Sequence, residues 1–382
     1  MQWNQIAAYI EENQDRYLEF LTQICSFEAR AYDKATLDQI ADHIAAFATD
    51  LGLGVQRKPM EKCGDFLTIE LNPGAPKGCF FHAHMDTVHD KGSFGTPAVK
   101  DQGDRLHGPG VIDCKGGIAI ALLTMKTMLE NGYDKHLRLL LTSDEEISNV
   151  LGGKEEIRFI QESAQGFPCA INCETAEGNE VVLARKGIVK YRLEIQGIGG
   201  HSGKKYFEAK NAILEAAHKI IALHAESQPG GTTYSCNVIS GGSAPNSIPD
   251  RCTVTVDIRA LTPDAIDTVL QTVERIANTS YLGSTSCQAE LLSIRPPMAR
   301  SAETDALFEN ILAACHKYDL GTLTPTEGGG GSDSCYTQAA GVTSICGMGA
   351  SGRFQHTPNE YLDKASIPLR AKILCAYLLE NQ

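Results

Sequence analysis

Histidine and acidic residues gather where apolar segments of this chain end. The stretch CFFHAHMDTV ends its apolar run with His82, His84 and Asp86. If this segment stays extended, the three side chains lie on one face, because side chains alternate along a strand. Asp86 can then accept a hydrogen bond from the His84 imidazole and fix which ring nitrogen faces outward, a usual arrangement behind metal ligands. His84 is therefore a candidate metal ligand, although a structural His-Asp pair explains this stretch equally well.

Four further segments deliver similar groups. Asp113 lies in the Gly-rich turn GVIDCKGG, where capping of the following helix is an equally good explanation. In LRLLLTSDEE, Glu145 and Glu146 end a run of three carboxylates whose mutual repulsion requires an opposing charge, unless the run is an ordinary surface cluster. CAINCET adds Glu174, and GRFQHTPNE adds His356. The recurrence predicts a metal site of imidazole and carboxylate ligands.

The expected ligands suit zinc first, with cobalt or manganese as alternatives, because none of the five segments supplies a convincing thiolate. A carboxylate shared between two ions would tolerate the crowding of acidic groups. Two divalent metal ions are therefore favoured over one.

The helical and apolar patterns around these groups predict an α/β protein. Helical patterns over residues 3–27 and 36–52 are followed by short apolar runs that alternate with helical stretches. Such alternation predicts a mixed, mostly parallel sheet with helices on both faces. In these sheets, functional sites gather at the carboxyl ends of the strands, where the acidic and histidine residues stand.

The pattern changes after residue 186. IVKYRLEIQGIGG alternates apolar and polar residues as a half-exposed strand does, and a strand-helix-strand-strand-helix order follows. This order predicts a small α+β domain over residues 187–296, inserted between two parts of the α/β domain at 1–186 and 297–382.

Composition limits the class of protein. The chain has 382 residues, of which 42% are hydrophobic and 21% charged, as expected of a globular protein. A formal net charge of -13 argues against binding to nucleic acid. No apolar run approaches the length of a membrane span, and the first residues have no secretory pattern, so we expect a cytoplasmic protein without a membrane partner. The thirteen cysteines contain no CxxC pair, which favours reduced, mostly buried thiols over redox or zinc-thiolate roles.

These motifs together resemble the M20 metallopeptidases, a family that includes carboxypeptidases, deacetylases, desuccinylases and aminoacylases. The resemblance is carried, in order along the chain, by HMDTV, GVIDCKGG, TSDEE, NCET, GGHSG, NSIPD, DIR, GGGGSD and GASGRFQHTPNE. It covers residues 15 to 380 approximately. Cys114 departs from the methionine usual after the aspartate, at a position that we interpret as packing.

The resemblance implies a ligand set for two metals. Asp113 would bridge the two ions, His84 and Glu174 would complete one site, and Glu146 and His356 would complete the other.

It also implies the groups that act beside the metals. Asp86 would orient His84, and Glu145 would be the general base that takes a proton from the attacking water. A cis peptide bond is expected between Asp113 and Cys114. His201 would act across a homodimer on the oxyanion of the reaction intermediate, so that the inserted domain would serve as a lid and dimerisation domain.

Substrate binding is assigned in the same way. Arg259 and Asn246 resemble residues that hold a substrate carboxylate, a task that suits a planar guanidinium, and Gly331 lies in the loop expected to line the pocket. A structural arginine and a surface histidine are the simpler readings of Arg259 and His201.

The resemblance therefore implies a hydrolase that cleaves an amide or peptide bond next to a free carboxylate, as a carboxypeptidase or an N-acyl-amino-acid deacylase. Its partner would be a small peptide or N-acyl amino acid. Within the family, the alternatives are a dipeptidase, including the Xaa-His type, and an N-carbamoyl-amino-acid amidohydrolase. An alternative of another class is a catalytically silent dimeric binding protein.

Overall fold

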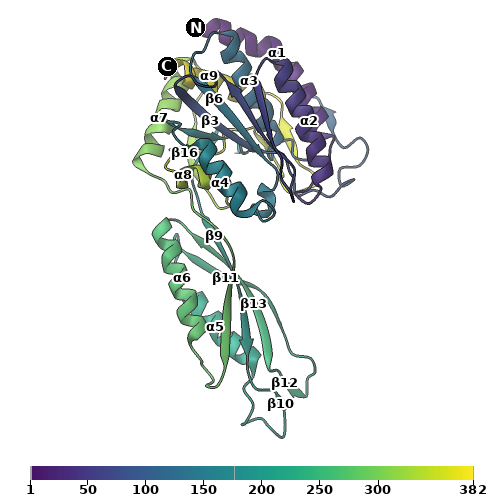
Figure 1. Ribbon diagram of the computed structural model, residues 1–382, viewed down its shortest axis with the longest axis vertical. Coiled ribbons are helices and arrows are strands. Elements are labelled where there is room, and N and C mark those ends of the chain that lie inside the picture. The colour runs from purple at the N-terminus through teal and green to yellow at the C-terminus, as the bar shows by residue number, and fades with distance from the viewer. Residues whose placement is uncertain (1, 176, 382) are drawn as a thin grey trace. The chain divides into compact units, whose positions relative to one another are not determined.

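The computed structural model describes residues 2–175 and 177–381, which divide into two compact units (Figure 1). The first unit comprises residues 2–184, 300–328 and 332–381, and the second comprises residues 185–299 with 329–331. The chain thus leaves the first unit, forms the second and returns.

The first unit is built on a six-stranded sheet in the order β1-β2-β6-β3-β7-β16. Strands β6, β3, β7 and β16 are parallel to one another, whereas β2 pairs antiparallel with both β6 and β1 at one edge. The mixed, mostly parallel sheet of the prediction is confirmed. The strands are β1 (Gly54–Lys58), β2 (Phe66–Leu71), β3 (Lys77–His84), β6 (His136–Thr142), β7 (Ala170–Asn172) and β16 (Ser344–Ile345).

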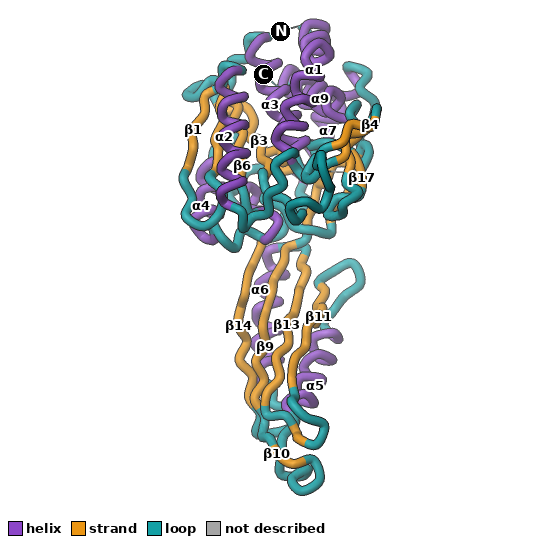
Figure 2. The backbone as a smooth tube through the Cα atoms, turned by 90° about the vertical axis from the view of Figure 1, so that its right-hand side faces the viewer, coloured by secondary structure: helices purple, strands orange, loops and turns teal. Residues whose placement is uncertain are grey.

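Helices cover both faces of this sheet (Figures 1 and 2). Cys79, Phe81 and Ala83 of β3 belong to the core shared with α1, α2, α3, α7 and α9, while α4 packs against the opposite face through Phe159 and Phe66. All six residues of β2 are buried for this reason. The helices are α1 (Trp3–Cys25), α2 (Lys34–Asp50), α3 (Lys115–Glu130), α4 (Gly153–Ala164), α7 (Ala302–Lys317), α8 (Ser334–Ala339) and α9 (Ser366–Glu380).

Helix α2 begins earlier than its sequence pattern predicts. The pattern places its start at Thr36, but the helix begins at Lys34, and the Asp33 side chain accepts a hydrogen bond from the Thr36 backbone N–H at 3.2 Å. Asp33 is the N-cap, so the threonine occupies the first turn instead of the cap.

Two smaller sheets complete the first unit. One has the order β17-β18-β5-β4, and the other pairs β15 with β8. Their strands are β4 (Lys100–Gln102), β5 (Arg105–His107), β8 (Glu180–Arg185), β15 (Thr324–Gly328), β17 (Gly352–Arg353) and β18 (Tyr361–Asp363).

The second unit is an antiparallel sheet in the order β11-β13-β9-β14, with two helices on one face (Figure 2). Alternate residues of β13, from Cys252 to Ala260, are buried beneath those helices. Strand β14 was not predicted, because its burial alternates weakly and both Leu291 and Leu292 are exposed. The elements are β9 (Gly187–Gln196), β10 (Gly200–His201), α5 (Ala212–Ala225), β11 (Thr233–Gly241), β12 (Ser247–Ile248), β13 (Arg251–Ala260), α6 (Pro263–Asn278) and β14 (Ser286–Arg295).

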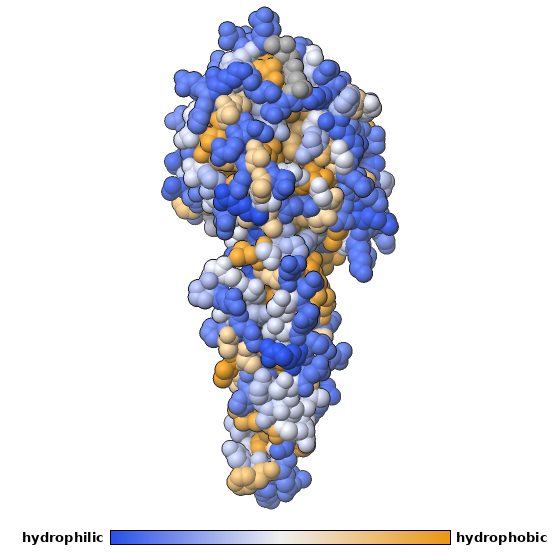
Figure 3. Space-filling view, turned by 90° about the vertical axis from the view of Figure 1, so that its left-hand side faces the viewer, coloured by the Kyte–Doolittle hydropathy of each residue, from blue (hydrophilic) through white to orange (hydrophobic). Residues whose placement is uncertain are grey.

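The surface agrees with the composition. Hydrophilic residues dominate the face drawn in Figure 3, with apolar residues scattered among them. Among the helices of residues 2–175 and 177–381, none combines the length and the apolar character needed to cross a bilayer.

Close packing of α3 against the chain after β7 explains a glycine of the GVIDCKGG motif. A Cβ atom on Gly117 would lie 1.9 Å from the Cys173 carbonyl oxygen, far inside van der Waals contact. The helix can approach residue 173 this closely only because residue 117 has no side chain.

We predict that Gly117→Ala lowers the midpoint of thermal unfolding and destabilises the protein by about 1–3 kcal/mol or more, because α3 must move away from Cys173. Thermal and urea unfolding measure the effect. Gly330→Ala is the control, since a Cβ atom there meets nothing within 4 Å. Equal stability of both variants would contradict the packing argument.

Candidate active site

The carboxyl ends of three neighbouring parallel strands bring the predicted residues together. Strand β3 ends at His84, which pairs with Thr142 at the end of β6, and His82 pairs with Asn172 at the end of β7. The segments that follow β6 and β7 carry the Glu145–Ile147 turn and Glu174. The edge expected for a site is therefore the edge that holds the candidate ligands.

Asp113 lies between the two candidate histidines. Its Oδ1 is 3.2 Å from His84 Nε2, and its Oδ2 is 3.1 Å from His356 Nε2. His84 Nε2 is also 3.4 Å from Glu174 Oε1, and His356 Nε2 is 3.2 Å from Glu146 Oε2. The five residues thus form two triads that share one carboxylate.

Asp86 lies behind His84. The His84 Nδ1 atom is 3.1 Å from the Asp86 carbonyl oxygen and 3.3 Å from its Oδ1. The same carboxylate accepts hydrogen bonds from the backbone N–H groups of Glu145 at 3.3 Å and Glu146 at 3.1 Å. Asp86 therefore connects the ring of His84 to the turn that carries the two glutamates.

The backbone at His356 has an uncommon conformation. Its φ is 62°, in the left-handed region that residues other than glycine rarely adopt, and Phe354 nearby has φ 65°. Unfavourable backbone conformations of this kind cluster at functional sites. The His356 side chain is 54% exposed, whereas the side chains of Asp113 and Glu146 in the same triad are 10% and 6% exposed. His356 thus borders solvent, while His84 is 1% exposed.

The site carries more negative charge than its burial allows. Burial, and then the charge of Asp113, raise the pKa of Glu146 to about 8 and also raise that of Glu174. Hydrogen bonds to Asp113 and Glu146 raise the pKa of His356 to about 11. Crowded, buried carboxylates of this kind need a cation or a proton to balance their charge.

The residues fit divalent metal ions. Glu146 Oε1 is buried and has no hydrogen-bond partner among residues 2–175 and 177–381, and ligand atoms of His84, Asp113 and Glu146 lie within 4.8 Å of one another. Imidazole nitrogens and carboxylate oxygens are ligands for zinc, cobalt or manganese. Cations at this cluster would take up the lone pairs that the protein itself leaves without donors.

Glu145 is buried beside these ligands. Its exposed fraction is 8%, and its charge contributes, after burial and Asp113, to the raised pKa of both Glu146 and Glu174. Glu145 is therefore an acidic side chain adjacent to the ligands that belongs to neither triad.

Cys114 lies closer to the ligands than the sequence suggested. Its sulfur accepts a hydrogen bond from the His84 backbone N–H at 3.2 Å, and its sulfur lies within 4.8 Å of ligand atoms of His84 and Glu174. Burial raises the pKa of its thiol to about 12. The neutral thiol therefore supports the strand behind His84, as a packing residue does, and the peptide bond before it is cis as expected.

A buried acidic pair, Asp144 and Glu156, lies next to the Glu145–Ile147 turn and was not predicted from the sequence. Asp144 Oδ2 accepts hydrogen bonds from the backbone of Leu151 at 2.9 Å and Gly152 at 3.0 Å. Burial, and then Asp144, raise the pKa of Glu156 well above its usual range. A neutral Glu156 carboxyl can donate to Asp144, so this pair fixes the loop without adding another charge.

The remaining candidates belong to the second unit and divide between its two ends. His201 on β10 pairs with Ser247 of β12, and the Ser202 N–H donates to the Asn246 carbonyl at 3.1 Å, so His201 and Asn246 are neighbours. Arg259 pairs with Ile188 at the start of β9, and a Cβ on Gly331 would lie 3.1 Å from the Ile188 side chain. Arg259 and Gly331 thus share the opposite end.

The Arg259 guanidinium has a partner of its own. Its Nε and Nη2 atoms donate to the two carboxylate oxygens of Asp257, at 2.6 Å and 3.1 Å. The structural role that the sequence left open for Arg259 is therefore present.

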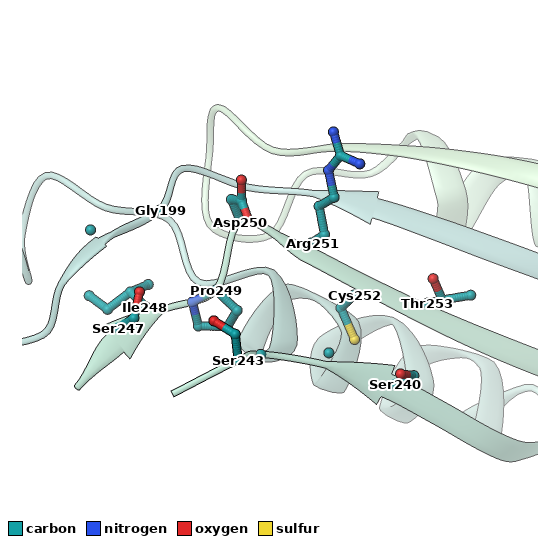
Figure 4. A pocket seen from close by; sticks show the side chains of 13 residues that line it. Gly199, Ser240, Ser243, Ser247, Ile248, Pro249, Asp250, Arg251, Cys252 and Thr253 are labelled. Atoms are coloured by element: carbon teal, nitrogen blue, oxygen red, sulfur yellow. The ribbon is translucent and has the colours of Figure 1, made fainter. Parts of the chain in front are cut away.

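Beside His201 and Asn246 lies a cleft of about 570 Å³, which the sequence did not indicate. Figure 4 shows Ser243, Pro249 and Asp250 around it, on the segments that join β11, β12 and β13, and Ser247 on β12. Its lining is mainly serine and glycine, with Asp250 and Arg251 as the charged residues.

Comparison with known proteins decides the family. The model described as peptidase family M20/M25/M40 matches residues 80–380. The chain belongs to this family. The resemblance inferred from the motifs is confirmed, and the M20 protein is a hydrolase that acts on amide bonds and whose family membership implies binding of divalent metal.

Relatives in this family span several named activities. Carboxypeptidase G2 from Pseudomonas sp. strain RS-16 is 25% identical over 378 residues, covering 97% of this chain and 90% of the relative. A succinyl-diaminopimelate desuccinylase from Rickettsia canadensis is 32% identical over 142 residues, covering 34% of this chain and 36% of the relative.

Solved structures share the fold. A putative aminohydrolase from methicillin-resistant Staphylococcus aureus has a TM-score of 0.81 at 17% identity and covers 100% of both chains. An M20 family metallo-carboxypeptidase from Sulfolobus solfataricus has a TM-score of 0.76 at 16% identity, covering 95% of this chain and 98% of its own. At these identities the likeness concerns the fold alone.

Divalent metal is predicted to stabilise the protein. An ion that binds only the folded state at 100 times its Kd adds about 2.7 kcal/mol, so Zn²⁺ or Mn²⁺ should raise the midpoint of thermal unfolding of the chelator-treated protein by several degrees.

Asp113→Asn should abolish most of this rise, because both triads share that carboxylate. Asp101→Asn, at an exposed carboxylate paired with Lys364, is the control and should keep the rise. If metal raises the midpoint of thermal unfolding of Asp113→Asn as much as that of the control, Asp113 is not a ligand shared by both ions.

Proposed function

We propose that this M20 hydrolase is a dinuclear metal-dependent enzyme that cleaves an amide bond next to a free carboxylate, as a carboxypeptidase or an N-acyl-amino-acid deacylase. The observation that carries the proposal is the position of Asp113, whose two oxygens face His84 and His356 separately. The names of carboxypeptidase G2 and the desuccinylases support an amide substrate with a free carboxylate.

The proposed ligands are His84, Asp113 and Glu174 for one ion, and Asp113, Glu146 and His356 for the other, with zinc as the expected metal. When bound, such ions polarise the amide carbonyl and make water acidic enough to attack near neutral pH. Asp86 holds His84 through Nδ1, so that Nε2 faces the carboxylates.

Glu145 moves the proton in the proposed reaction. It takes a proton from the water as the oxygen bonds to the amide carbon, and it gives that proton to the leaving nitrogen as the C–N bond breaks. The products are a carboxylic acid and an amine, and Glu145 returns to its starting state.

The second unit supplies the proposed substrate contacts. Arg259 holds the substrate carboxylate in the way suited to a planar guanidinium, with the backbone of Gly331 as a further contact at the same end of the unit. Asn246 lies at the other end beside His201, so it contacts the substrate bound in the partner subunit. We propose that the unit, over residues 187–296, is a lid and dimerisation domain, and that His201 of one subunit stabilises the oxyanion formed in its partner.

Two activities within the family are the alternatives to a carboxypeptidase or deacylase. Solved structures with this fold include human carnosine dipeptidase 1, with a TM-score of 0.71 at 13% identity, and an amidase of the hydantoinase/carbamoylase family from Burkholderia multivorans, with a TM-score of 0.65 at 15% identity. A panel of N-acyl amino acids, dipeptides and N-carbamoyl amino acids at equal concentration separates the three. Preference for dipeptides or carbamoyl compounds would replace the leading assignment.

The role of Glu145 predicts a variant that retains metal and loses turnover. Glu145→Gln should lower kcat by about 10²–10⁴-fold, because an amide cannot accept the proton from water. Metal content measured on the same samples should equal that of the wild type.

Glu155→Gln is the matched control, because Glu155, on the helix α4 that follows the turn, is exposed and paired with Lys58 of β1. It should leave kcat unchanged. A Glu145→Gln enzyme with near-normal kcat would exclude the role as general base.

Recognition of a carboxylate by Arg259 predicts a specific loss of discrimination. The wild type should hydrolyse a substrate with a free carboxylate at least about tenfold better in kcat/KM than the same compound with a carboxamide, since charge-assisted bidentate hydrogen bonds are the strong ones.

Arg259→Gln should reduce this ratio toward one, mainly through KM of the free acid. Arg192→Gln is the control, because Arg192 pairs with Glu290 on the same sheet. An undiminished ratio in Arg259→Gln would assign the carboxylate to another residue.

A further inference from the structure

Glu360 is a fully buried carboxylate near the candidate metal centre that belongs to neither triad. Its side chain is 0% exposed, and its Oε1 accepts hydrogen bonds from the backbone N–H groups of Ile112 at 3.0 Å and Asp113 at 3.3 Å. Its Oε2 is 2.7 Å from His89 Nε2. A buried acid with all these partners is fixed in place, because charge-assisted hydrogen bonds hold both oxygens.

The backbone of Glu360 holds the same segment. The Gly108 N–H donates to the Glu360 carbonyl oxygen at 3.3 Å, and the next residue begins β18, which pairs with β5. Both the carbonyl and the carboxylate of Glu360 therefore accept hydrogen bonds from segment 108–113. This segment ends at Asp113, so these hydrogen bonds help to fix the position of that residue.

Glu360 also stands only four residues after His356. The turn between them is closed by the Glu360 N–H, which donates to the Thr357 carbonyl at 3.1 Å, and by the Thr357 N–H, which donates to Phe354 at 3.1 Å. The residue that holds the Asp113 backbone is thus the end of the turn that presents His356. One carboxylate joins two candidate ligands that lie far apart in the sequence.

We propose that Glu360 is a positioning residue of the metal centre, which sets the spacing between the Asp113 carboxylate and the His356 imidazole. This inference rests on the proposed function, because it assumes that these two residues bind one metal ion together. Groups that orient metal ligands from behind typically change metal affinity or activity by about 10–100-fold when they are removed.

The second unit provides a matched residue with a purely structural task. Glu215 is also 0% exposed, accepts backbone hydrogen bonds from Tyr281 at 3.1 Å and Leu282 at 2.9 Å, and pairs with Lys219 at 3.2 Å. It has the same burial and the same kind of bonds as Glu360 but lies in a unit without the proposed metal ligands. A loss of thermal stability in both variants is therefore the effect of altering a buried glutamate. A loss of Zn²⁺ affinity in the Glu360 variant alone shows an effect on the metal centre.

The experiment compares Glu360→Gln and Glu215→Gln in the full chain. Zn²⁺ is titrated into each chelator-treated protein by calorimetry with a competing chelator, and kcat and KM are measured separately with the best substrate of the panel. Glutamine keeps the length and one acceptor oxygen but loses the charge, so the Asp113 backbone is held less firmly.

We expect Glu360→Gln to bind the more weakly held of the two Zn²⁺ ions about 10–100-fold less tightly than the wild type does. Its kcat should fall with little change in KM. Glu215→Gln should lower thermal stability and leave Zn²⁺ affinity as in the wild type. Equal Zn²⁺ affinity in wild type and Glu360→Gln overturns the inference.

A second variant covers the case that Glu360→Gln fails to fold. His89→Gln leaves Glu360 in place and loosens only its Oε2, so it should weaken Zn²⁺ binding in the same direction by a smaller factor, and unchanged affinity there overturns the inference. Failure of the proposed function gives a different result: the wild type itself would bind no Zn²⁺, or Glu145→Gln would hydrolyse normally.

Discussion

The structure of the first unit depends on keeping several carboxylates buried beside one another. Asp113, Glu146 and Glu174 lie within reach of two imidazoles, and the burial and repulsion that raise the pKa of Glu146 to about 8 would drive such groups apart in a flexible chain. They stay together because each is attached to a separate rigid element. The same unfavourable charge that makes the cluster costly makes it a strong attractor of cations.

Parallel strands supply part of that rigidity. Neighbouring parallel strands end at one edge, so His84, the Glu145–Ile147 turn and Glu174 need no long loops to meet. The other part is close packing of the helix that follows Asp113. Gly117 lets α3 approach within van der Waals distance of the Cys173 carbonyl, immediately before Glu174. Asp113, which precedes α3, and Glu174, which follows β7, are thereby held at a fixed distance from each other.

The sequence predicted the parts of this site that follow from local rules. Alternation along β3 placed His84 and Asp86 together, and the α/β pattern predicted the sheet edge, because both depend on periodicity within a short segment. Glu360 could not be found in this way. It belongs to the GASGRFQHTPNE motif, but its partners Ile112 and Asp113 lie 248 and 247 residues away, so no local pattern shows which groups its side chain holds. Strand β14 was missed for a related reason, since an edge strand with exposed leucines lacks the alternation by which strands are recognised.

Arg259 illustrates why a structural and a binding role need not exclude each other. Asp257 occupies the Nε and Nη2 side of its guanidinium, and among the contacts of residues 2–175 and 177–381 no hydrogen bond involves Nη1. A guanidinium presents five N–H donors in a rigid plane, so fixing one side with a carboxylate also fixes the direction of the other. The unpaired side can then receive a second carboxylate without rotating, which reduces the conformational entropy lost on binding. The ion pair with Asp257 is in this way compatible with the proposed recognition of a substrate carboxylate by Arg259.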